Sequence, residues 1–248
     1  MSSMPPPLAP NACHLWLIDQ QTIMASGKYD ACYAQLTADE TQRVATFKAN
    51  KRRQQFVIGR GALRAILRRY CADAAAEFCV NEHGKPALKD AASGVHFNLS
   101  HSGSTIAIAV AAQPVGVDIE THKVRRNLQQ IADSVFHPRE WHPGMWGTEA
   151  QQLQHFYRLW TLKEALVKAT GQGLSVPLTS FYFDFQSAAR PEVHWHKAAE
   201  RNTEDWLFAQ REISTGVSLA IALQSAADDL PLSIHTFEGE HCLTVAND

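Results

Sequence analysis

VHFNLSHSGSTIAIAVAAQPVGVDIE, residues 95–120, is the stretch of this chain that decides its fold. Val95–Leu99 and Thr105–Ala112 are rich in strand-forming residues, so the sequence predicts a β-hairpin whose turn is the glycine-containing segment Ser100–Ser104. Gln113-Pro114 interrupts this pattern, and Val115–Glu120 resumes it as another short strand. Three strands so close together predict a sheet in the middle of the chain.

Helical and strand-like patterns alternate on both sides of this stretch. Thr37-Ala-Asp-Glu40 matches a capping box, which predicts that a helix begins there. The other predicted segments are strands at His14–Asp19, Ser180–Phe185, Trp206–Glu212 and Ser218–Leu223, and helices at Gln54–Tyr70, Asn127–Phe136 and Thr148–Gly171. We therefore expect a mixed α/β (α+β) fold with a disordered tail at residues 1–10, an N-terminal α/β half at 11–112 and a C-terminal α/β half at 113–248.

The composition is that of an ordinary globular protein. Hydrophobic residues make up 45% of the 248 residues and charged residues 19%, which excludes a disordered or collagen-like chain. The longest apolar run, Thr105–Ala112, is far shorter than the ~20 residues of a membrane-spanning helix, and residues 1–10 lack the features of a signal peptide. The cysteines show no Cys-x-x-Cys spacing and fit reduced thiols. We expect a cytoplasmic protein with no membrane partner.

A dense block of basic residues lies in the first half of the chain. Nine of them lie between Arg43 and Arg69 with no acidic residue among them, and such a block attracts anions. The predicted helix there buries one apolar face, and four arginines share another face: Arg53, Arg60, Arg64 and Arg68. Two interpretations stay open, a solvated stripe or a surface that binds an anionic substrate or partner.

Two acidic residues occur on the predicted strand at Val115–Glu120. Asp118 and Glu120 are two positions apart, so their side chains point to the same side of that strand. Neighbouring carboxylates raise each other's pKa unless a cation neutralises them, and Mg²⁺ commonly takes one or two carboxylates together with substrate phosphates. The pair therefore fits half of a magnesium–phosphate site, although two solvated acids on a strand edge would give the same pattern.

Further charged groups recur on the predicted helix at Thr148–Gly171. Trp160, Glu164 and Lys168 are spaced by four residues, which stacks Glu164 and Lys168 on one side of the helix with Lys163 beside them. These groups could belong to a site or form an ordinary ion pair on a helix surface.

Two predicted turns carry phosphate-binding chemistry. The hydroxyls, the imidazole and the backbone amides of Ser100–Gly103 can donate hydrogen bonds to phosphate oxygens, and Lys85 lies on the restricted turn Asn81–Pro86. A nucleophile pair of Ser100 and His101 is disfavoured, because adjacent side chains point apart and no third, orienting acid is evident.

The combined motifs are similar to those of the Sfp-type 4′-phosphopantetheinyl transferases. Three motifs carry the resemblance, in the same order and separation as in that family: Phe97-Asn-Leu-Ser-His-Ser-Gly103, Val115-Gly-Val-Asp-Ile-Glu120 and Trp160-x-x-Lys-Glu-Ala-x-x-Lys168. Gly84-Lys-Pro86 and Phe136-His-Pro-Arg-Glu140 also resemble the family. The resemblance extends over about residues 47–178.

The resemblance implies an activity and a set of site residues. Family members are monomers of two similar α/β halves that bind coenzyme A and Mg²⁺ in the cleft between them, and they transfer 4′-phosphopantetheine to a carrier-protein serine and release adenosine 3′,5′-bisphosphate. The implied metal ligands are Asp118, Glu120 and Glu164. The implied coenzyme A contacts are Arg53, Lys85, Ser100, His101, Asp118, Lys163 and Lys168, with Glu164 and Lys168 as the catalytic pair. Gln55 departs from the family, since many members have arginine there.

The implied partners are acyl or peptidyl carrier proteins of fatty acid, polyketide or nonribosomal peptide biosynthesis. Such carriers are acidic, so the basic block from Arg43 to Arg69 offers a complementary surface. A Mg²⁺-dependent phosphohydrolase or nuclease would also need clustered carboxylates and lysines, but it leaves the Ser-His-Ser segment unexplained. A nucleic-acid-binding module that uses the basic helix ranks third, because its apolar residues are expected in the core, and we expect no nucleic-acid partner.

Overall fold

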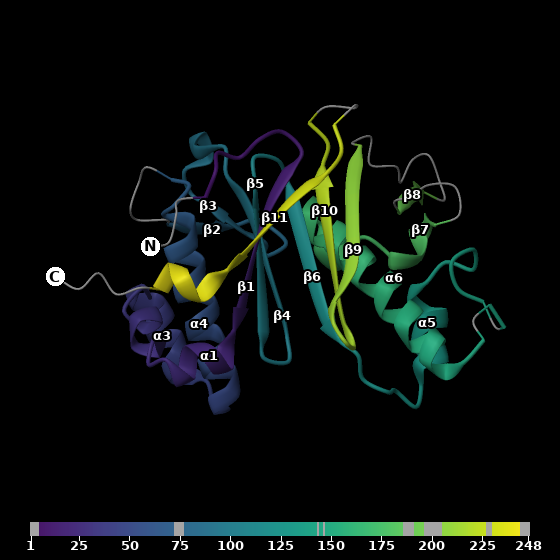
Figure 1. The fold of residues 1–248 in the computed structure, drawn as a ribbon, viewed down its shortest axis with the longest axis horizontal. Helices are drawn as coiled ribbons and strands as arrows, with labels where there is room; N and C mark the ends of the chain where they lie inside the picture. Colours follow the sequence, from purple (N-terminus) through teal and green to yellow (C-terminus); the bar gives the residue numbers. More distant parts are fainter. Residues whose placement is uncertain are drawn as a thin grey trace.

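Two β-sheets lie at the centre of the molecule, and the two longest helices cover their outer faces (Figure 1). The computed structural model describes residues 5–71, 77–142, 144–145, 147–185, 191–195, 205–226 and 230–243. The first sheet has the strand order β11-β1-β5-β4, and the second has the order β6-β10-β9. The bounds of these strands are β1 Ala12–Asp19, β4 His96–Ser102, β5 Thr105–Ala111, β6 Val115–Thr121, β9 Trp206–Ser214, β10 Val217–Gln224 and β11 Ser233–Glu238.

The two halves of the chain repeat one arrangement of elements. In the first half, β1 is followed by helix α4, Asn50–Leu67, and then by the hairpin β4–β5. In the second half, β6 is followed by helix α6, Glu149–Thr170, and then by the hairpin β9–β10. The strand orders correspond, β1-β5-β4 and β6-β10-β9, and all neighbours within these two sets are antiparallel. The predicted α/β class and the two similar halves are therefore confirmed.

Three apolar clusters separate four layers in the order helix, sheet, sheet, helix. Residues such as Leu63 pack α4 on the first sheet, and residues such as Leu162 pack α6 on the second. A third cluster, which includes Leu15, Val117 and Ile221, fills the space between the sheets. The central strands are thus buried on both faces, which explains why their sequences are continuous apolar runs and do not alternate.

Shorter elements surround these layers. They are the helices α1 Gln20–Ala25, α2 Tyr29–Tyr33, α3 Ala38–Thr46 and α5 Leu128–Val135, the strand pairs β2 Phe78–Val80 with β3 Pro86–Leu88 and β7 Phe181–Asp184 with β8 Glu192–Trp195, and the 3₁₀ turns η1 Ala91–Ser93, η2 Gly173–Ser175, η3 Leu178–Ser180 and η5 Gly239–Leu243. The predicted capping box is present at Thr37 and Glu40. Within the part of the chain described above, no helix combines the length and apolarity needed to span a membrane.

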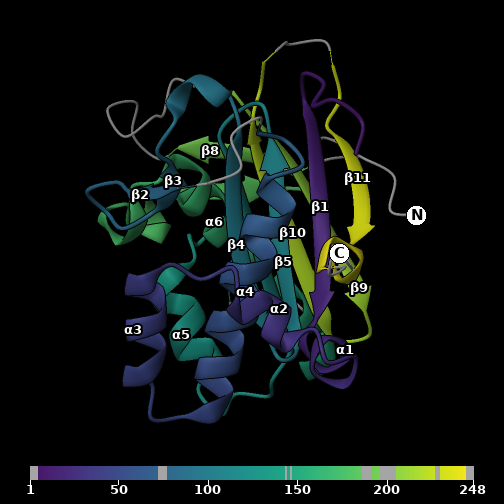
Figure 2. The ribbon, with the colours of Figure 1, turned by 90° about the vertical axis from the view of Figure 1, so that its left-hand side faces the viewer.

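The two ends of the chain meet in the first sheet. β11 lies far beyond residue 113, yet it pairs in parallel with β1, with Cys13 opposite Ile234, and Figure 2 shows these two strands side by side. The end of the second half therefore completes the sheet of the first half. Of the predicted tail, residues 1–4 lie outside the described residues, and residues 5–10 form no helix or strand, although Leu8 packs against the first-half core.

The predicted position of the hairpin turn is wrong. β4 extends to Ser102, so Ser100 and His101 lie in the strand, and the turn is formed by Gly103 and Ser104. The physical reason is that the side chains of Ser100 and Ser102 bond to the backbone of β6, which keeps this segment extended.

The basic face of α4 is neutralised in part. Arg60 and Arg64 pair with Glu40 of α3, which lies just outside the basic block in the sequence. Arg64 is buried, with 4% of its surface exposed. These two arginines therefore belong neither to a solvated stripe nor to a fully free anion-binding surface.

Helix α6 lies unusually close to β6. A Cβ atom added to Gly116 would lie 2.0 Å from the carbonyl oxygen of Ala165, so only glycine permits this approach. The close packing brings the last turns of α6 over the β6 residue Asp118, which Lys168 contacts directly.

Candidate functional site

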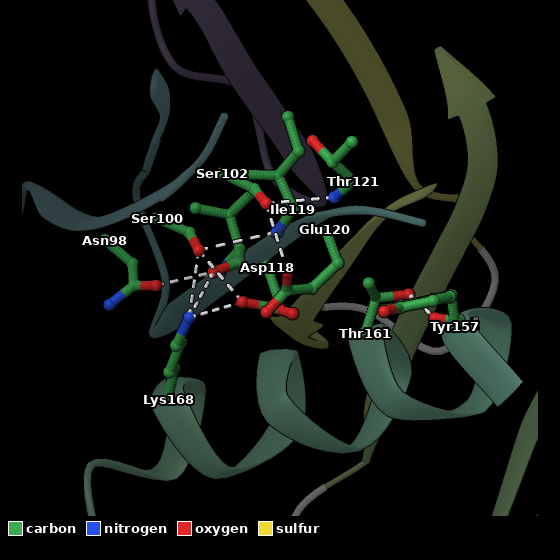
Figure 3. Close-up of polar contacts among 11 residues, drawn as sticks. Asn98, Ser100, Ser102, Asp118, Ile119, Glu120, Thr121, Tyr157, Thr161 and Lys168 are labelled. Carbon is green, nitrogen blue, oxygen red and sulfur yellow. Dashed lines mark hydrogen bonds and ion pairs between the residues drawn. The ribbon is translucent and has the colours of Figure 1, made fainter. Parts of the chain in front are cut away.

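The two sheets meet along β4 and β6, and side chains join them there. Three β4 side chains accept hydrogen bonds from alternate backbone N–H groups of β6: Asn98 from Val117 at 3.0 Å, Ser100 from Ile119 at 3.4 Å and Ser102 from Thr121 at 2.9 Å. These contacts form a row between the strands (Figure 3). We call Asn98, Ser100 and Ser102 the seam residues. They occupy the position that a backbone ladder would take between paired strands.

The acids Asp118 and Glu120 lie on the same side of β6, against the seam residues. Ser100 Oγ donates to Asp118 Oδ1 at 2.9 Å, and Ser102 Oγ donates to Glu120 Oε2 at 3.0 Å. Burial raises the pKa of Asp118, which is 3% exposed, while Lys168 and these hydrogen bonds oppose that shift. Burial also raises the pKa of Glu120, and the charge of Asp118 adds to the effect.

Helix α6 contributes a cation and a third carboxylate. Lys168 Nζ lies 2.5 Å from Asp118 Oδ1 and 3.0 Å from Ser100 Oγ (Figure 3). Glu164 is half-buried one turn earlier. Burial raises its pKa, Lys168 opposes the shift, and the charges of Asp118 and Glu120 raise it further. Three acids from two elements therefore repel one another across a small space, with one ammonium group among them.

The residues fit a hard divalent cation. Asp118 Oδ2 is buried without a hydrogen-bond partner, and an unpaired buried carboxylate oxygen is costly unless a cation binds it. Among the described residues, no group of three His, Cys, Asp or Glu side chains is arranged as a complete metal cage. Mg²⁺ does not require one, because it is usually held by one or two carboxylates with water and substrate phosphates.

Two adjoining cavities open beside these groups. A cavity of about 290 Å³ is lined by Lys85, Glu164 and Lys168, by His83 and Asn98, and otherwise by glycines and apolar residues. A larger one, of about 510 Å³, has a basic lining that includes Arg43, Arg52, Arg60 and His101. The two share the lining residues Pro86, Asn98 and Leu99, so they adjoin. Of the three acids, Glu164 is found in the described lining of the smaller cavity, whereas Asp118 and Glu120 are found in neither lining.

Lys85 reaches the smaller cavity from the first half of the chain. The turn that carries it is held by Asn81, whose Nδ2 donates to the carbonyl of Gly171 just after α6 at 2.8 Å and whose Oδ1 accepts from the Lys85 N–H at 2.8 Å. Lys85 Nζ donates to the carbonyl of Ala169 at 2.8 Å. Burial lowers the pKa of Lys85 to about 8, so near neutral pH this ammonium group is poised to gain an anionic partner.

The other predicted contacts are distributed differently. His101 lies on the opposite side of β4 from Ser100 and lines the larger cavity. Arg53 donates to the backbone carbonyl of Phe47 at 3.0 Å and is not among the residues found to line that cavity, whereas Arg52 and Gln55 are. The basic block in the sequence indicates Arg52 as one of several candidate arginines. The sequence does not show which of these arginines the helix turns toward the cavity.

Lys163 is a correction to the predicted site. Its side chain is fully buried on the far side of α6, where Nζ lies 2.6 Å from Glu140 Oε1 and donates to the carbonyls of Leu178 and Phe181, both at 2.6 Å. Neighbouring residues of an α-helix point about 100° apart, so Lys163 points into the second-half core while Glu164 faces the cavity. Lys163 therefore does not reach either cavity that holds the other charged groups.

Comparison with known proteins gives a consistent result. Residues 114–222 match the 4′-phosphopantetheinyl transferase superfamily, and residues 25–113 match the family described as 4′-phosphopantetheinyl transferase, N-terminal. A 4′-phosphopantetheinyl transferase of Bacillus subtilis is 36% identical over 160 residues, which cover 64% of this chain and 70% of the relative. The chain belongs to the 4′-phosphopantetheinyl transferase superfamily.

Other members of this transferase superfamily show similar agreement. The 4′-phosphopantetheinyl transferase HetI of Nostoc is 35% identical over 167 residues, 65% of this chain and 70% of the relative. The transferase Sfp of Bacillus subtilis is 32% identical over 160 residues, 59% of this chain and 70% of the relative. The solved holo-ACP-synthase of Plasmodium yoelii covers 46% of this chain and 95% of its own with a TM-score of 0.37 and 15% identity, a likeness too partial to bear on the fold. The family predicted from the motifs is confirmed, and the chain is a transferase.

Proposed function

We propose that this transferase moves 4′-phosphopantetheine from coenzyme A to a serine of an apo acyl or peptidyl carrier protein and requires Mg²⁺. One observation carries the proposal: the acids Asp118, Glu120 and Glu164 lie around Lys168, and Glu164, Lys168 and Lys85 line one cavity. Catalysis of phosphoryl transfer depends mainly on positioning and on neutralising charge. The family and this arrangement of charges support the same reaction.

The two cavities suggest how coenzyme A is held. The basic lining of the larger cavity, with Arg43, Arg52 and His101, suits the phosphorylated adenosine end. The smaller cavity would then receive the diphosphate, with Lys85 and Lys168 as its cationic contacts. The pantetheine arm would leave through the remaining, less polar part of the smaller cavity.

The carboxylates would serve as metal ligands. A magnesium ion bound to Asp118, Glu120 and Glu164 would screen the diphosphate and stabilise the charge that develops on the leaving group. The unpartnered Asp118 Oδ2 supports this assignment. Lys168 would neutralise the other Asp118 oxygen, which it contacts at 2.5 Å, and thereby limit the repulsion among the three acids.

In the proposed reaction, the carrier serine Oγ attacks the phosphorus that bears the pantetheine arm. The bond from that phosphorus to the bridging oxygen breaks, and its electron pair leaves with adenosine 3′,5′-bisphosphate. The serine proton passes to Glu164, or to a water that Glu164 orients, because this carboxylate lines the cavity in which the diphosphate would lie. Lys168 stabilises the negative charge on the transferred phosphoryl group.

The proposed partner and setting follow from surface charge and thiol chemistry. Lys48, just before α4, and Lys51 and Arg52, in its first turn, are exposed. They would attract an acidic carrier, so the association rate should fall as salt is added. All five cysteines are free, which supports a reducing, cytoplasmic setting. We propose that the chain acts as a monomer, because each half already contributes to one site.

The test is carrier modification measured by intact mass. The purified chain is mixed with coenzyme A, Mg²⁺ and apo carriers from several pathways, and the mass gained by each carrier is compared with that of phosphopantetheine. Carriers that stay unmodified throughout would overturn the proposal. Release of adenosine 3′,5′-bisphosphate without any carrier would instead favour a Mg²⁺-dependent phosphohydrolase.

A further inference from the structure

Ser100 and Ser102 make the same pair of hydrogen bonds two residues apart. Ser100 Oγ accepts from the Ile119 N–H and donates to the preceding acid, Asp118. Ser102 Oγ accepts from the Thr121 N–H and donates to the preceding acid, Glu120. Each hydroxyl thus clamps one acid of β6 to the backbone of the next residue, as Figure 3 shows.

These clamps fix one oxygen of each acid and leave the other available. Asp118 Oδ2 is buried and unpartnered. Within the described residues, the hydrogen bonds found for Glu120 involve only Oε2, which accepts from Ser102. A carboxylate that is held through one oxygen loses rotational freedom before a ligand arrives, which lowers the entropic cost of binding.

Both serine side chains lie inside the seam between the sheets. Ser100 is 6% exposed and Ser102 is 9% exposed, and Ser100 Oγ also accepts a hydrogen bond from Lys168 Nζ at 3.0 Å. Their hydroxyls are already engaged with β6. A role in orienting the acids therefore explains these two hydroxyls better than direct contact with phosphate.

We propose that Ser102, acting with Ser100, is a positioning residue that orients Glu120 and Asp118 so that their free oxygens converge on one divalent cation. The inference rests on the proposed magnesium-dependent transfer and adds to it a source of the metal site's affinity. Outer hydrogen-bond partners of metal ligands typically change metal affinity by about 10–100-fold when removed.

Asn98 provides a matched control. Its Oδ1 accepts from the Val117 N–H at 3.0 Å, so it belongs to the same seam, but no hydrogen bond to a carboxylate is found for it in the described part of the chain. Asn98→Ala therefore removes a seam bond alone, whereas Ser102→Ala removes a seam bond and the contact with Glu120. A purely structural role would make the two variants behave alike.

The experiment measures Mn²⁺ binding to the full chain without coenzyme A, by the electron paramagnetic resonance signal of free Mn²⁺. Ser102→Ala should weaken binding about tenfold, Ser102→Thr should restore it because the hydroxyl returns, and Asn98→Ala should lower the melting temperature while keeping the wild-type Mn²⁺ affinity. In transfer assays, Ser102→Ala should raise the Mg²⁺ concentration for half-maximal rate more than it lowers the rate at saturating Mg²⁺.

Other outcomes overturn the inference in distinguishable ways. Equal Mn²⁺ affinity in wild type and Ser102→Ala, or equal weakening in Ser102→Ala and Asn98→Ala, would leave the proposed transfer intact and refute the positioning role. Lack of Mn²⁺ binding by the wild-type chain, in the presence of coenzyme A as well as without it, would refute the metal site of the proposed function as well. If Ser102→Ala does not fold, Ser100→Ala takes its place. A smaller loss of affinity is then expected, because Lys168 still holds Asp118 Oδ1 at 2.5 Å.

Discussion

Replacing Lys163 separates a structural role from a role in substrate binding. Lys163→Met keeps most of the side-chain volume and removes the ammonium group, which is fully buried and paired with Glu140 at 2.6 Å. The structure predicts a loss of stability, because a buried carboxylate then lacks its counter-charge. It also predicts that the KM for coenzyme A stays unchanged, since Lys163 does not reach the cavities.

The size of the effect can be worked out from the partners that remain. Removing one member of a buried ion pair costs about 3–5 kcal/mol. Glu140 keeps two backbone donors, the N–H groups of His137 at 2.9 Å and Phe183 at 2.7 Å, which places the expected cost near the lower end, about 3 kcal/mol. For a chain of this size that corresponds to a fall of roughly 6–12 °C in Tm.

Urea unfolding followed by tryptophan fluorescence gives the stability, and coenzyme A saturation curves at a temperature below both transitions give the KM. The double variant Lys163→Met with Glu140→Gln should recover part of the loss, because it leaves no buried charge without a partner. An unchanged urea midpoint combined with a raised KM for coenzyme A would refute this reasoning and return Lys163 to the site.

Three further predictions concern the site itself. Asp118→Asn should bring transfer below detection while Tm is kept, as measured by carrier mass and thermal melting; retained transfer would contradict the metal assignment. Because burial lowers the pKa of Lys85 to about 8, its charge is lost as the pH rises, so the KM for coenzyme A should increase between about pH 7 and 9. Lys85→Met should abolish that dependence. A wild-type KM that does not change with pH would count against a contact between Lys85 and coenzyme A. Arg52→Ala should raise the KM for coenzyme A by roughly tenfold, which corresponds to the loss of one charge-assisted hydrogen bond of about 1.5 kcal/mol. Arg53→Ala should raise this KM less. The reverse order would restore Arg53, the residue predicted from the sequence.

Most of the fold could be predicted because its main elements carry local signals. Six of the seven strands in the two main sheets coincide with runs of apolar residues, and the long helices α4 and α6 coincide with helical spacing. β11 was not predicted, since it is stabilised by pairing with β1 more than two hundred residues away, and periodicity within one segment does not report such a partner. The short pair β2 and β3 was missed for a different reason: each strand has three residues, too few to show a period.

The site could be predicted in part. The two-residue spacing of Asp118 and Glu120 and the four-residue spacing of Glu164 and Lys168 are properties of one strand and one helix, and the structure brings these residues together. The errors concern residues whose partner lies elsewhere in the chain. Lys163 turns to Glu140, and Ser100 lies in β4 instead of the predicted turn because it bonds to β6. Neither partner is visible from the motif that contains the residue.

The absence of a side chain at Gly116 sets the distance between the two acids of β6 and Glu164 of α6. A methyl group there would collide with the Ala165 carbonyl at 2.0 Å and would push the helix outward by on the order of 1 Å, a misplacement that can slow an enzyme about a hundredfold. The spacing of the reacting groups thus depends on the hydrogen atom that Gly116 has in place of a side chain, on a buried strand that no substrate contacts. An enzyme engineer who substitutes this glycine would change the distance between β6 and α6 while every catalytic side chain stays the same.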